Sequence, residues 1–259
     1  MKLGISTACF YPLETENSLE LVGKSGVENC EIFFNANCEL EQSFVEKLHN
    51  ITKEYGTKVI SVHPTMSLAE SFMLFSAYDR RLQEGLDNYR RYGEIAAFLG
   101  AEYVIMHGGK PNGVLSDDEY CERFLQIYET VSESGVTLLQ ENVAKHRAND
   151  IDFLKNMVRN LGDKANFCLD VKQSIKGGYT PFDVVDAVGK NIRHLHISDN
   201  NASSDCLLPI NGDFDFKKLF DKMKQFDYNG AAMIEVYRWA YQEPQEVFAS
   251  LNLLKEKIN

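Results

Sequence analysis

Short apolar runs alternate with longer amphipathic segments from one end of the chain to the other. The runs are rich in β-branched and aromatic residues, as buried strands are, and they are too short for buried helices. We expect eight strands, at Leu3–Ala8, Glu28–Phe33, Lys58–Val62, Tyr103–Met106, Val136–Gln140, Asn166–Leu169, Arg193–Ile197 and Ala231–Val236. Because a helix-length segment separates each strand from the next, the pattern predicts parallel strands joined by right-handed crossovers.

The segments between these strands carry apolar residues at helical spacing. We expect helices at Ser43–Tyr55, Tyr78–Leu99, Ser116–Ser134, Asn149–Asn160, Pro181–Val188, Asp215–Phe226 and Pro244–Ile258. Boundary signals support these ranges, since Gly100 suits a helix C-cap and Ser116 with Glu119 fits a capping box.

Eight strand–helix units in a chain of 259 residues match the usual size of one (β/α)8 barrel. No low-complexity linker, proline-rich hinge or block of charge divides the chain. We therefore predict an α/β fold of the TIM-barrel type, with residues 1–259 forming a single domain.

The composition of the chain argues against nucleic acids and membranes as its partners. The net charge is −11, so the surface as a whole repels nucleic acid and anionic membranes. The six cysteines form no C-x-x-C pair, which fits free thiols in a reducing cytoplasm. The first residues do not resemble a secretory signal, and no apolar stretch approaches the roughly 18 residues of a membrane span. We expect a cytoplasmic protein that acts on a small molecule and does not bind membranes.

Four of the predicted strands end in a side chain that can ligate a divalent metal, namely Glu141, Asp170, His196 and Glu235. In a barrel of βα units the carboxyl ends of all strands meet at one rim, so these side chains should converge there. Taken singly, each is ordinarily a loop charge, a helix cap or a core histidine. The joint pattern of carboxylates and imidazole suits a hard or borderline divalent ion and predicts a metal-dependent enzyme.

Two further histidines follow earlier strands. His63 comes after KVISV and His107 after YVIM, so they extend the set of candidate ligands around the rim. Within HLHIS, strand alternation points His194 and His196 to the same side. A second metal beside the first is therefore an open alternative.

Taken in order, the motifs SVHP, LGAEYVIMHGG, LLQEN, CLDVKQ, HLHISD and MIEVY resemble those of the xylose isomerase-like TIM-barrel superfamily. This superfamily groups sugar and sugar-phosphate isomerases and epimerases with apurinic nucleases of the endonuclease IV type. The resemblance covers essentially the whole chain, from KLGIS to IEVY. Each motif is short, and their order and spacing carry the resemblance.

The resemblance implies that Glu141, Asp170, His196 and Glu235 match the single-metal site of ketose 3-epimerase and inosose isomerase type enzymes. In those enzymes the two glutamates also move protons, which implies catalytic roles for Glu141 and Glu235. The implied cofactor is a divalent metal (Mn, Zn, Mg or Co), and the implied substrate is a small carbohydrate. Homo-oligomers are common among these enzymes, so an oligomer is left open.

The nuclease branch of the superfamily is the main alternative. There His63 and His107 would join Glu141 around a second zinc, and a third metal would lie nearby. The chain departs from that pattern, because Gln173 and Leu207 stand where histidines for the third metal are needed. A net charge of −11 also offers little means of neutralising DNA phosphates.

Substrate contacts are expected from side chains just past the strand ends, with Lys145, Lys172, Gln173 and Trp239 as candidates. Gln173 replaces a histidine with which many epimerases hold their substrate, which implies changed specificity or lost activity. We expect a sugar or sugar-phosphate isomerase or epimerase that works through a metal-stabilised enediolate. A non-catalytic barrel and a metal lyase or dehydratase are further alternatives, since a fold alone does not fix chemistry.

Overall fold

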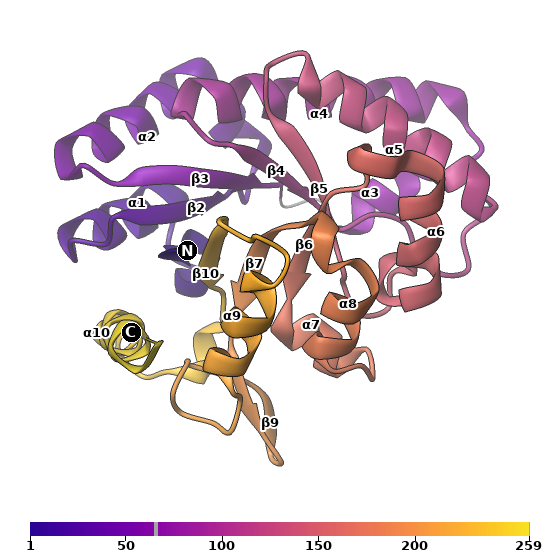
Figure 1. Ribbon diagram of the computed structural model, residues 1–259. Coiled ribbons are helices and arrows are strands. Elements are labelled where there is room, and N and C mark those ends of the chain that lie inside the picture. Colours follow the sequence, from indigo (N-terminus) through magenta and orange to yellow (C-terminus); the bar gives the residue numbers. More distant parts are fainter. Residues whose placement is uncertain (65–66, 259) are drawn as a thin grey trace.

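A closed barrel of eight parallel strands forms the centre of the molecule in the computed structural model, which describes residues 1–64 and 67–258 (Figure 1). The strands are β1 (Lys2–Ser6), β2 (Asn29–Phe33), β3 (Lys58–His63), β4 (Tyr103–Met106), β5 (Thr137–Glu141), β6 (Phe167–Asp170), β7 (Ile192–Ile197) and β10 (Ala231–Ile234). Their order around the barrel is β1-β10-β7-β6-β5-β4-β3-β2, so strands that follow one another in sequence lie side by side. Each strand overlaps the range predicted for it, and the predicted (β/α)8 barrel is confirmed.

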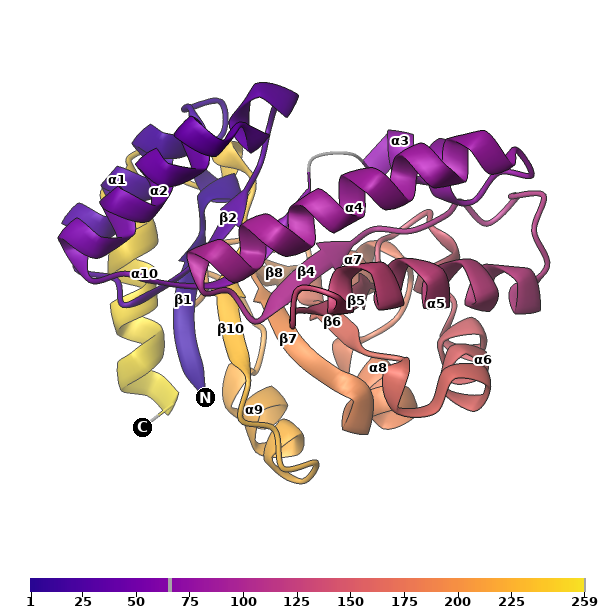
Figure 2. The same ribbon diagram turned by 90° about the horizontal axis from the view of Figure 1, so that it is seen from above.

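Helices pack around the outside of this barrel (Figure 2). They are α1 (Thr15–Lys24), α2 (Gln42–Tyr55), α3 (Ser67–Leu74), α4 (Asp79–Leu99), α5 (Asp117–Ser132), α6 (Ile151–Leu161), α7 (Val171–Lys176), α8 (Pro181–Val188), α9 (Phe216–Lys224) and α10 (Pro244–Ile258). All the predicted helices are present. The boundary signals also hold, since Gly100 adopts a φ of 76° and Ser116 and Glu119 form the expected capping box.

The sequence pattern does not predict α1, α3 and α7. Helices α3 and α7 have eight and six residues, too few for a helical period to stand out from the flanking loops. Helix α7 begins directly after β6, where the side chain of Asp170 accepts a hydrogen bond from the Gln173 backbone N–H at 2.8 Å. The end of β6 is therefore fixed by a cap as well as by strand pairing.

A small antiparallel sheet also escapes prediction, because its strands are short and polar. It consists of β8 (Asp199–Asn201) and β9 (Ser204–Leu207) and follows β7. The Asp199 carboxylate accepts backbone N–H groups of Ile210, Gly212 and Phe214 at 2.9, 3.0 and 2.9 Å. One buried aspartate thus organises the long connection between β7 and α9.

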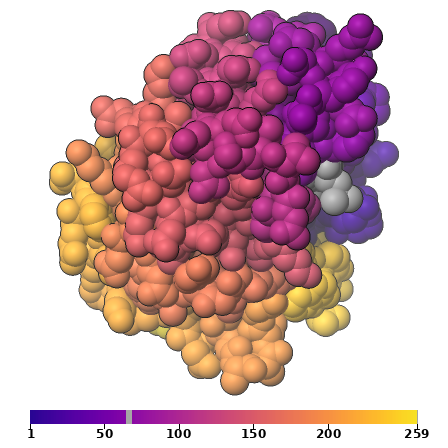
Figure 3. Space-filling model, turned by 90° about the vertical axis from the view of Figure 1, so that its right-hand side faces the viewer, coloured from indigo at the N-terminus to yellow at the C-terminus, as the bar shows by residue number. Residues whose placement is uncertain are grey.

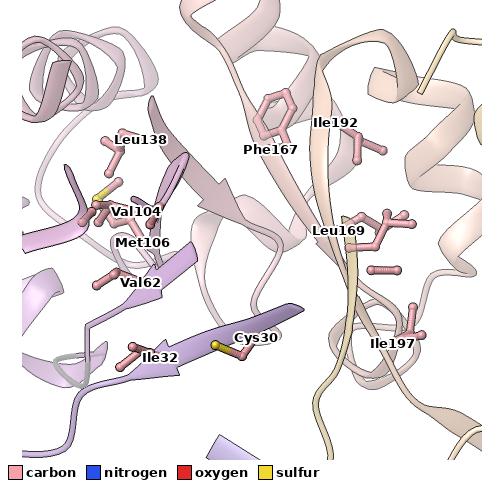
Figure 4. Packing of buried hydrophobic residues seen from close by; sticks show 14 of the residues in the cluster. Cys30, Ile32, Val62, Val104, Met106, Leu138, Phe167, Leu169, Ile192 and Ile197 are labelled. Carbon is pink, nitrogen blue, oxygen red and sulfur yellow. The ribbon is translucent and has the colours of Figure 1, made fainter. Parts of the chain in front are cut away.

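Strand alternation divides the side chains of the barrel into two layers. Those facing outward pack against the helices in one large cluster, and Figure 4 shows Ile32, Val62, Met106, Leu138 and Leu169 among them. Those facing inward include two small apolar groups, Ile60 with Ala231 and Met233, and Ile105 with Leu139 and Cys168. Burying one such aliphatic side chain contributes roughly 1.5–3 kcal/mol, so both layers stabilise the barrel. Toward the carboxyl ends of the strands the next inward positions become polar, and the candidate site lies there.

The face shown in Figure 3 is formed largely by the middle of the chain, coloured magenta to orange. Charged residues such as Arg80, Arg81 and Asp87 occur along α4, the long helix of this region. Among residues 1–64 and 67–258, no helix is long and apolar enough to cross a membrane.

Candidate active site

Neighbouring strands carry the four predicted metal ligands to one level of the barrel. Glu141 and Asp170 are the last residues of β5 and β6, and Glu235 directly follows β10. In the strand register Asp170 pairs with His196, and the Glu235 N–H donates to the Ile197 carbonyl at 3.1 Å. Because alternate residues share a face, this register turns all four side chains into the mouth of the barrel.

Three of these side chains, the carboxylates, surround one nitrogen of the fourth, His196. His196 Nδ1 lies 3.0 Å from Glu141 Oε1, 2.8 Å from Glu235 Oε2 and 3.9 Å from Asp170 Oδ2. One ligand atom from each of the four residues lies within 4.8 Å of all the others. Glu141, Asp170 and His196 are buried, whereas the Glu235 side chain keeps 15% of its surface exposed. The four candidate ligands are therefore shielded from solvent on the side of the barrel interior, and solvent reaches them at Glu235, at the mouth of the barrel.

Hydrogen bonds fix both the backbone and the carboxylate of Asp170. Its backbone N–H donates to Asn142 Oδ1 at 2.7 Å, and Asn142 Nδ2 donates to Ser174 Oγ at 2.8 Å. The side-chain oxygens of Asp170 accept from the Gln173 N–H and from Lys172 Nζ, the latter at 2.9 Å. Asn142 thus links β5 to β6 and α7, which fixes Asp170 relative to Glu141.

Lys172 places a buried ammonium beside these ligands. Its Nζ lies 2.9 Å from Asp170 Oδ2 and 3.6 Å from Glu235 Oε2, and its side chain is only 2% exposed. Burial would lower the pKa of Lys172, but Asp170 and Glu235 raise it well above its usual value. Lys172 therefore stays cationic and neutralises part of the carboxylate charge.

The carboxylates respond to two opposing influences. Burial raises the pKa of Glu235, yet Lys172 and His196 lower it to about 2. Burial likewise opposes ionisation of Glu141, but hydrogen bonding to His196 and His63 lowers its pKa well below the usual range. Burial raises the pKa of Asp170 to about 7 despite the opposing effect of Lys172. Both glutamates are thus ionised at neutral pH and able to accept a proton.

His63 and His107 approach Glu141 from the other side. His63 Nε2 lies 3.7 Å from Glu141 Oε2 and His107 Nε2 lies 3.4 Å from it, with the two ring centroids 4.5 Å apart. His63 Nδ1 lies 3.0 Å from the Pro64 carbonyl, which favours a proton on Nδ1 and leaves Nε2 turned toward Glu141. Burial and the nearby His63 lower the pKa of His107 to about 3, so it is neutral. Both histidines can therefore act as ligands beside Glu141.

Two buried glutamates of the site were not predicted from the sequence. Glu70 accepts the backbone N–H groups of His107 and Gly108, both at 2.9 Å, and the Tyr89 hydroxyl at 2.7 Å. Glu31 lies inside the barrel against the face of His196 opposite to Glu141. The sequence signal of Glu31 was a charge between the apolar residues Cys30 and Ile32 of a strand, whereas Glu70 lies on a helix too short to recognise.

The predicted substrate contacts occupy different places. Lys172 lies inside the site, while Gln173 Oε1 accepts the Ala144 N–H at 3.0 Å and so joins the loops after β5 and β6. Lys145 is exposed and adopts a φ of 63°, an uncommon conformation for a residue other than glycine. Trp239 is 59% exposed, with its ring centroid 5.7 Å from that of Tyr237. Contact of any of these residues with a substrate stays a prediction.

Asp205 is the one ligand that the sequence offers for a third metal. Asp205 Oδ2 lies 3.6 Å from Lys176 Nζ, and the position two residues later is Leu207. In the part of the chain that the structure describes, no group of three or more candidate ligands includes Asp205.

A surface pocket also opens at the opposite end of the barrel. It is lined by Lys2, Asn29 and Lys58, which are the first residues of β1, β2 and β3, among others. None of the candidate ligand groups in residues 1–64 and 67–258 involves its lining. The candidate ligand groups therefore lie apart from this pocket, and in barrels of this type the active site lies at the carboxyl ends of the strands.

Comparison with known proteins identifies the family of this barrel. A family model described as xylose isomerase-like TIM barrel matches residues 19–257. The fructoselysine 3-epimerase of Escherichia coli O157:H7 is 22% identical over 261 residues, which cover 95% of this chain and 94% of the epimerase.

Solved structures match over almost the full length. A D-tagatose 3-epimerase-like protein has a TM-score of 0.81 and 22% identity, covering 99% of this chain and 96% of that chain. The IOLI protein, solved with a bound zinc atom, has a TM-score of 0.78 and 17% identity, covering 100% of this chain and 98% of that chain. Sugar 3-epimerases thus occur among both the sequence relatives and the structural neighbours.

Proposed function

Since the chain belongs to the xylose isomerase-like TIM barrel family, we propose that it is a divalent-metal-dependent isomerase or epimerase of a sugar or sugar phosphate. The resemblance predicted from the motifs is confirmed by the family match. One observation carries the proposal further. Three carboxylates and His196 Nδ1 converge at the mouth, and two of the carboxylates belong to glutamates that can exchange protons.

The residues fit a divalent cation. The atoms that face one another are carboxylate oxygens and one imidazole nitrogen, the donor set that suits Mn, Zn, Mg or Co. Glu235 Oε2 is buried and forms no hydrogen bond within the described residues, although it lies 2.8 Å from His196 Nδ1. A cation held by Glu141, Asp170, His196 and Glu235 would satisfy this oxygen. The zinc in the related IOLI structure supports the proposal but leaves the choice of metal open.

The two glutamates lie on either side of the other ligands, since β5 and β10 flank β6 and β7 in the barrel. We assign to Glu141 and Glu235 the roles of base and acid: one carboxylate accepts the proton from the carbon next to the carbonyl, and the other, after it takes up a proton from solvent during turnover, returns a proton to that carbon. Their ionised state at rest suits the first of these steps. When bound, the metal would stabilise the negative charge that develops on the substrate enediolate.

The polar rim completes the proposal. Lys172 can donate to a substrate oxygen from within the site, and we expect Lys145, Gln173 and Trp239, which follow β5, β6 and β10 in the chain, to contact the substrate as it enters. An exposed aromatic ring and nearby cations suit the apolar face and the oxygens of a carbohydrate. We keep residues 1–259 as one functional domain in this proposal.

A metal phosphodiesterase of the endonuclease IV kind is the second candidate. It is favoured by His63 and His107, whose Nε2 atoms lie within 3.7 Å of Glu141 Oε2. It is opposed by the missing histidines at Gln173 and Leu207 and by the net charge of −11.

The decisive experiment measures deuterium uptake from D2O by NMR, with a panel of ketoses and ketose phosphates. The metal-loaded protein should exchange the proton next to the carbonyl of at least one substrate, and the chelated protein should not. As a matched control, Glu39→Gln alters a buried glutamate that binds Thr15 and the Asn35 N–H, and it should exchange normally. Absence of exchange with every candidate, in protein shown to contain metal, would reject the isomerase proposal.

A further inference from the structure

The interior of the barrel contains a carboxylate that the proposed chemistry does not use. Glu31 lies on β2 with no exposed surface, directly below the candidate ligands. Its Oε2 accepts a hydrogen bond from the Ser61 hydroxyl at 2.7 Å and lies 3.0 Å from His196 Nε2. It also lies 3.5 Å from His194 Nε2, and His194 Nε2 is 3.3 Å from Ser61 Oγ. Glu31 is therefore the centre of a buried polar group that includes one proposed metal ligand.

The two nitrogens of His196 face different surroundings. Nδ1 is turned to Glu141, Asp170 and Glu235 at the mouth, whereas Nε2 is turned to Glu31 in the interior. A carboxylate can only accept, so Nε2 must carry a proton to form this hydrogen bond. The contacts of Nδ1 with Glu141 and Glu235 likewise place a proton on Nδ1 in the metal-free protein. A metal at the mouth would displace that proton, while the Nε2–H bond to Glu31 keeps the ring turned so that the Nδ1 lone pair faces the metal.

We propose that Glu31 is a positioning residue that fixes the orientation and tautomer of His196 for metal binding, and this inference rests on the proposed metal site. A ligand histidine commonly donates its second ring N–H to a carboxylate, which locks the ring and makes the ligating nitrogen more basic. Ser61 supports this role, because its hydroxyl occupies Glu31 Oε2 from the side and restricts how the carboxylate can turn.

A purely stabilising role accounts poorly for Glu31. Its other oxygen, Oε1, is buried and has no hydrogen-bond partner within the described residues. Burying a carboxylate with an unsatisfied oxygen is costly, and an apolar residue at this position would avoid that cost. Retention of the charge is better explained by what it does to His196.

A separate metal held by Glu31, His194 and His196 is the competing explanation, since their donor atoms lie within 4.8 Å of one another. The Ser61 hydroxyl favours hydrogen bonds over a metal here. It donates at 2.7 Å to Glu31 Oε2, the oxygen that faces both histidines and that such a metal would need.

The test compares metal affinity in Glu31→Ala, Glu31→Gln, Ser61→Ala and the control Glu39→Gln, by titrating the metal-free proteins with Co²⁺ or Mn²⁺. Glu31→Ala should bind about 10–100-fold more weakly. Glu31→Gln keeps an oxygen that can accept from Nε2–H, so it should recover part of the loss. Ser61→Ala should show the smallest loss, and Glu39→Gln should bind as the unaltered protein does.

Imidazole ¹⁵N NMR supplies a readout independent of catalysis. In the unaltered protein, with or without zinc, His196 should show a hydrogen-bonded Nε2–H, and zinc should bind at Nδ1. Folded Glu31→Ala or Glu31→Gln that binds metal as tightly as the unaltered protein would overturn the inference, and so would zinc bound at Nε2.

The outcomes separate this inference from the proposed function. Normal metal binding without proton exchange would reject the isomerase and leave Glu31 in its role. Proton exchange in the unaltered protein, together with unchanged metal affinity in the Glu31 variants, would support the isomerase and reject the role of Glu31. If the unaltered protein bound no divalent metal the proposed function would fail, and a missing Nε2–H hydrogen bond in the metal-free spectrum would remove the role of Glu31 as well.

Discussion

The two halves of the barrel contribute to the site in different ways. Strands β5, β6 and β7 and the end of β10 supply Glu141, Asp170, His196 and Glu235, whose free atoms face one another at the mouth. Strands β2, β3 and β4 lead instead to Glu31, His63 and His107, which contact those ligands from below or from the side. We infer from this difference that one half would present the reactive atoms, while Glu31 in the other half would set the orientation of His196.

Glu235→Gln, in the half of the barrel that carries the metal ligands, should cause the largest loss of proton exchange. Glutamine keeps the size of the side chain but cannot act as a general base and is a poorer metal ligand. Proton exchange should fall by at least about 10²–10⁴-fold, the usual contribution of general acid–base catalysis. Deuterium uptake measured by NMR checks this. Full activity in the folded variant would exclude Glu235 from proton transfer.

Acid should weaken metal binding through the same half of the barrel. In the metal-free protein the pKa of Asp170 is about 7, and the pKa of His196 is well above its usual value because Cys168, Glu31 and Glu235 together outweigh the effect of burial. A metal must displace these protons, so acidification favours the metal-free state. As the pH is lowered toward 7, the apparent metal affinity should fall about tenfold per pH unit, because each bound metal displaces one proton from His196. Below pH 7 it should fall more steeply, because Asp170 is then protonated as well. Calorimetric titration at several pH values measures this slope; affinity independent of pH would contradict it.

Lys172→Met tests the charge balance within the site. Lys172 Nζ lies 2.9 Å from Asp170 Oδ2, so it competes with a metal for the same carboxylates. Replacing it with an apolar side chain of similar length should tighten metal binding by about tenfold or more, because a repelling cation is removed. If Lys172 also holds substrate, KM for the sugar should rise in the same variant. Weaker metal binding would show that Lys172 supports the ligands instead of competing for them.

His63→Ala and His107→Ala should have the smallest effects. Under a single-metal mechanism these histidines only border Glu141, so the number of bound metal ions should stay at one and proton exchange should change little. Metal analysis of the variants and the unaltered protein measures this number. Loss of a second tightly bound zinc in either variant would favour the two-metal alternative.

The sequence predicted the reactive half better than the supporting half. Glu141, Asp170 and Glu235 close apolar runs, and a charge at a strand end in a repeated βα pattern has a predictable position. Glu31 lies within a strand, so its importance depends on which strands face it across the barrel, and a linear pattern does not reveal that. Glu70 depends on the short helix α3 in the same way.

Local structure also adds contacts that the sequence did not predict. Gln173 is predicted to contact the substrate, and in the structure its Oε1 accepts a hydrogen bond from the Ala144 N–H. This contact could not be predicted, because it depends on how the loop after β5 folds back over α7. The connection from β9 to α9 escaped prediction for a similar reason, since Asp199 organises it through backbone groups eleven or more residues away.

The most direct measurement of the central claim is an anomalous difference map from a crystal of the protein loaded with Mn²⁺. We predict one strong peak surrounded by Glu141, Asp170, His196 and Glu235, with His196 coordinating through Nδ1. A peak confined to the side of His63 and His107, or coordination of the metal by Glu31 and His196 Nε2, would contradict the division of roles between the two halves of the barrel.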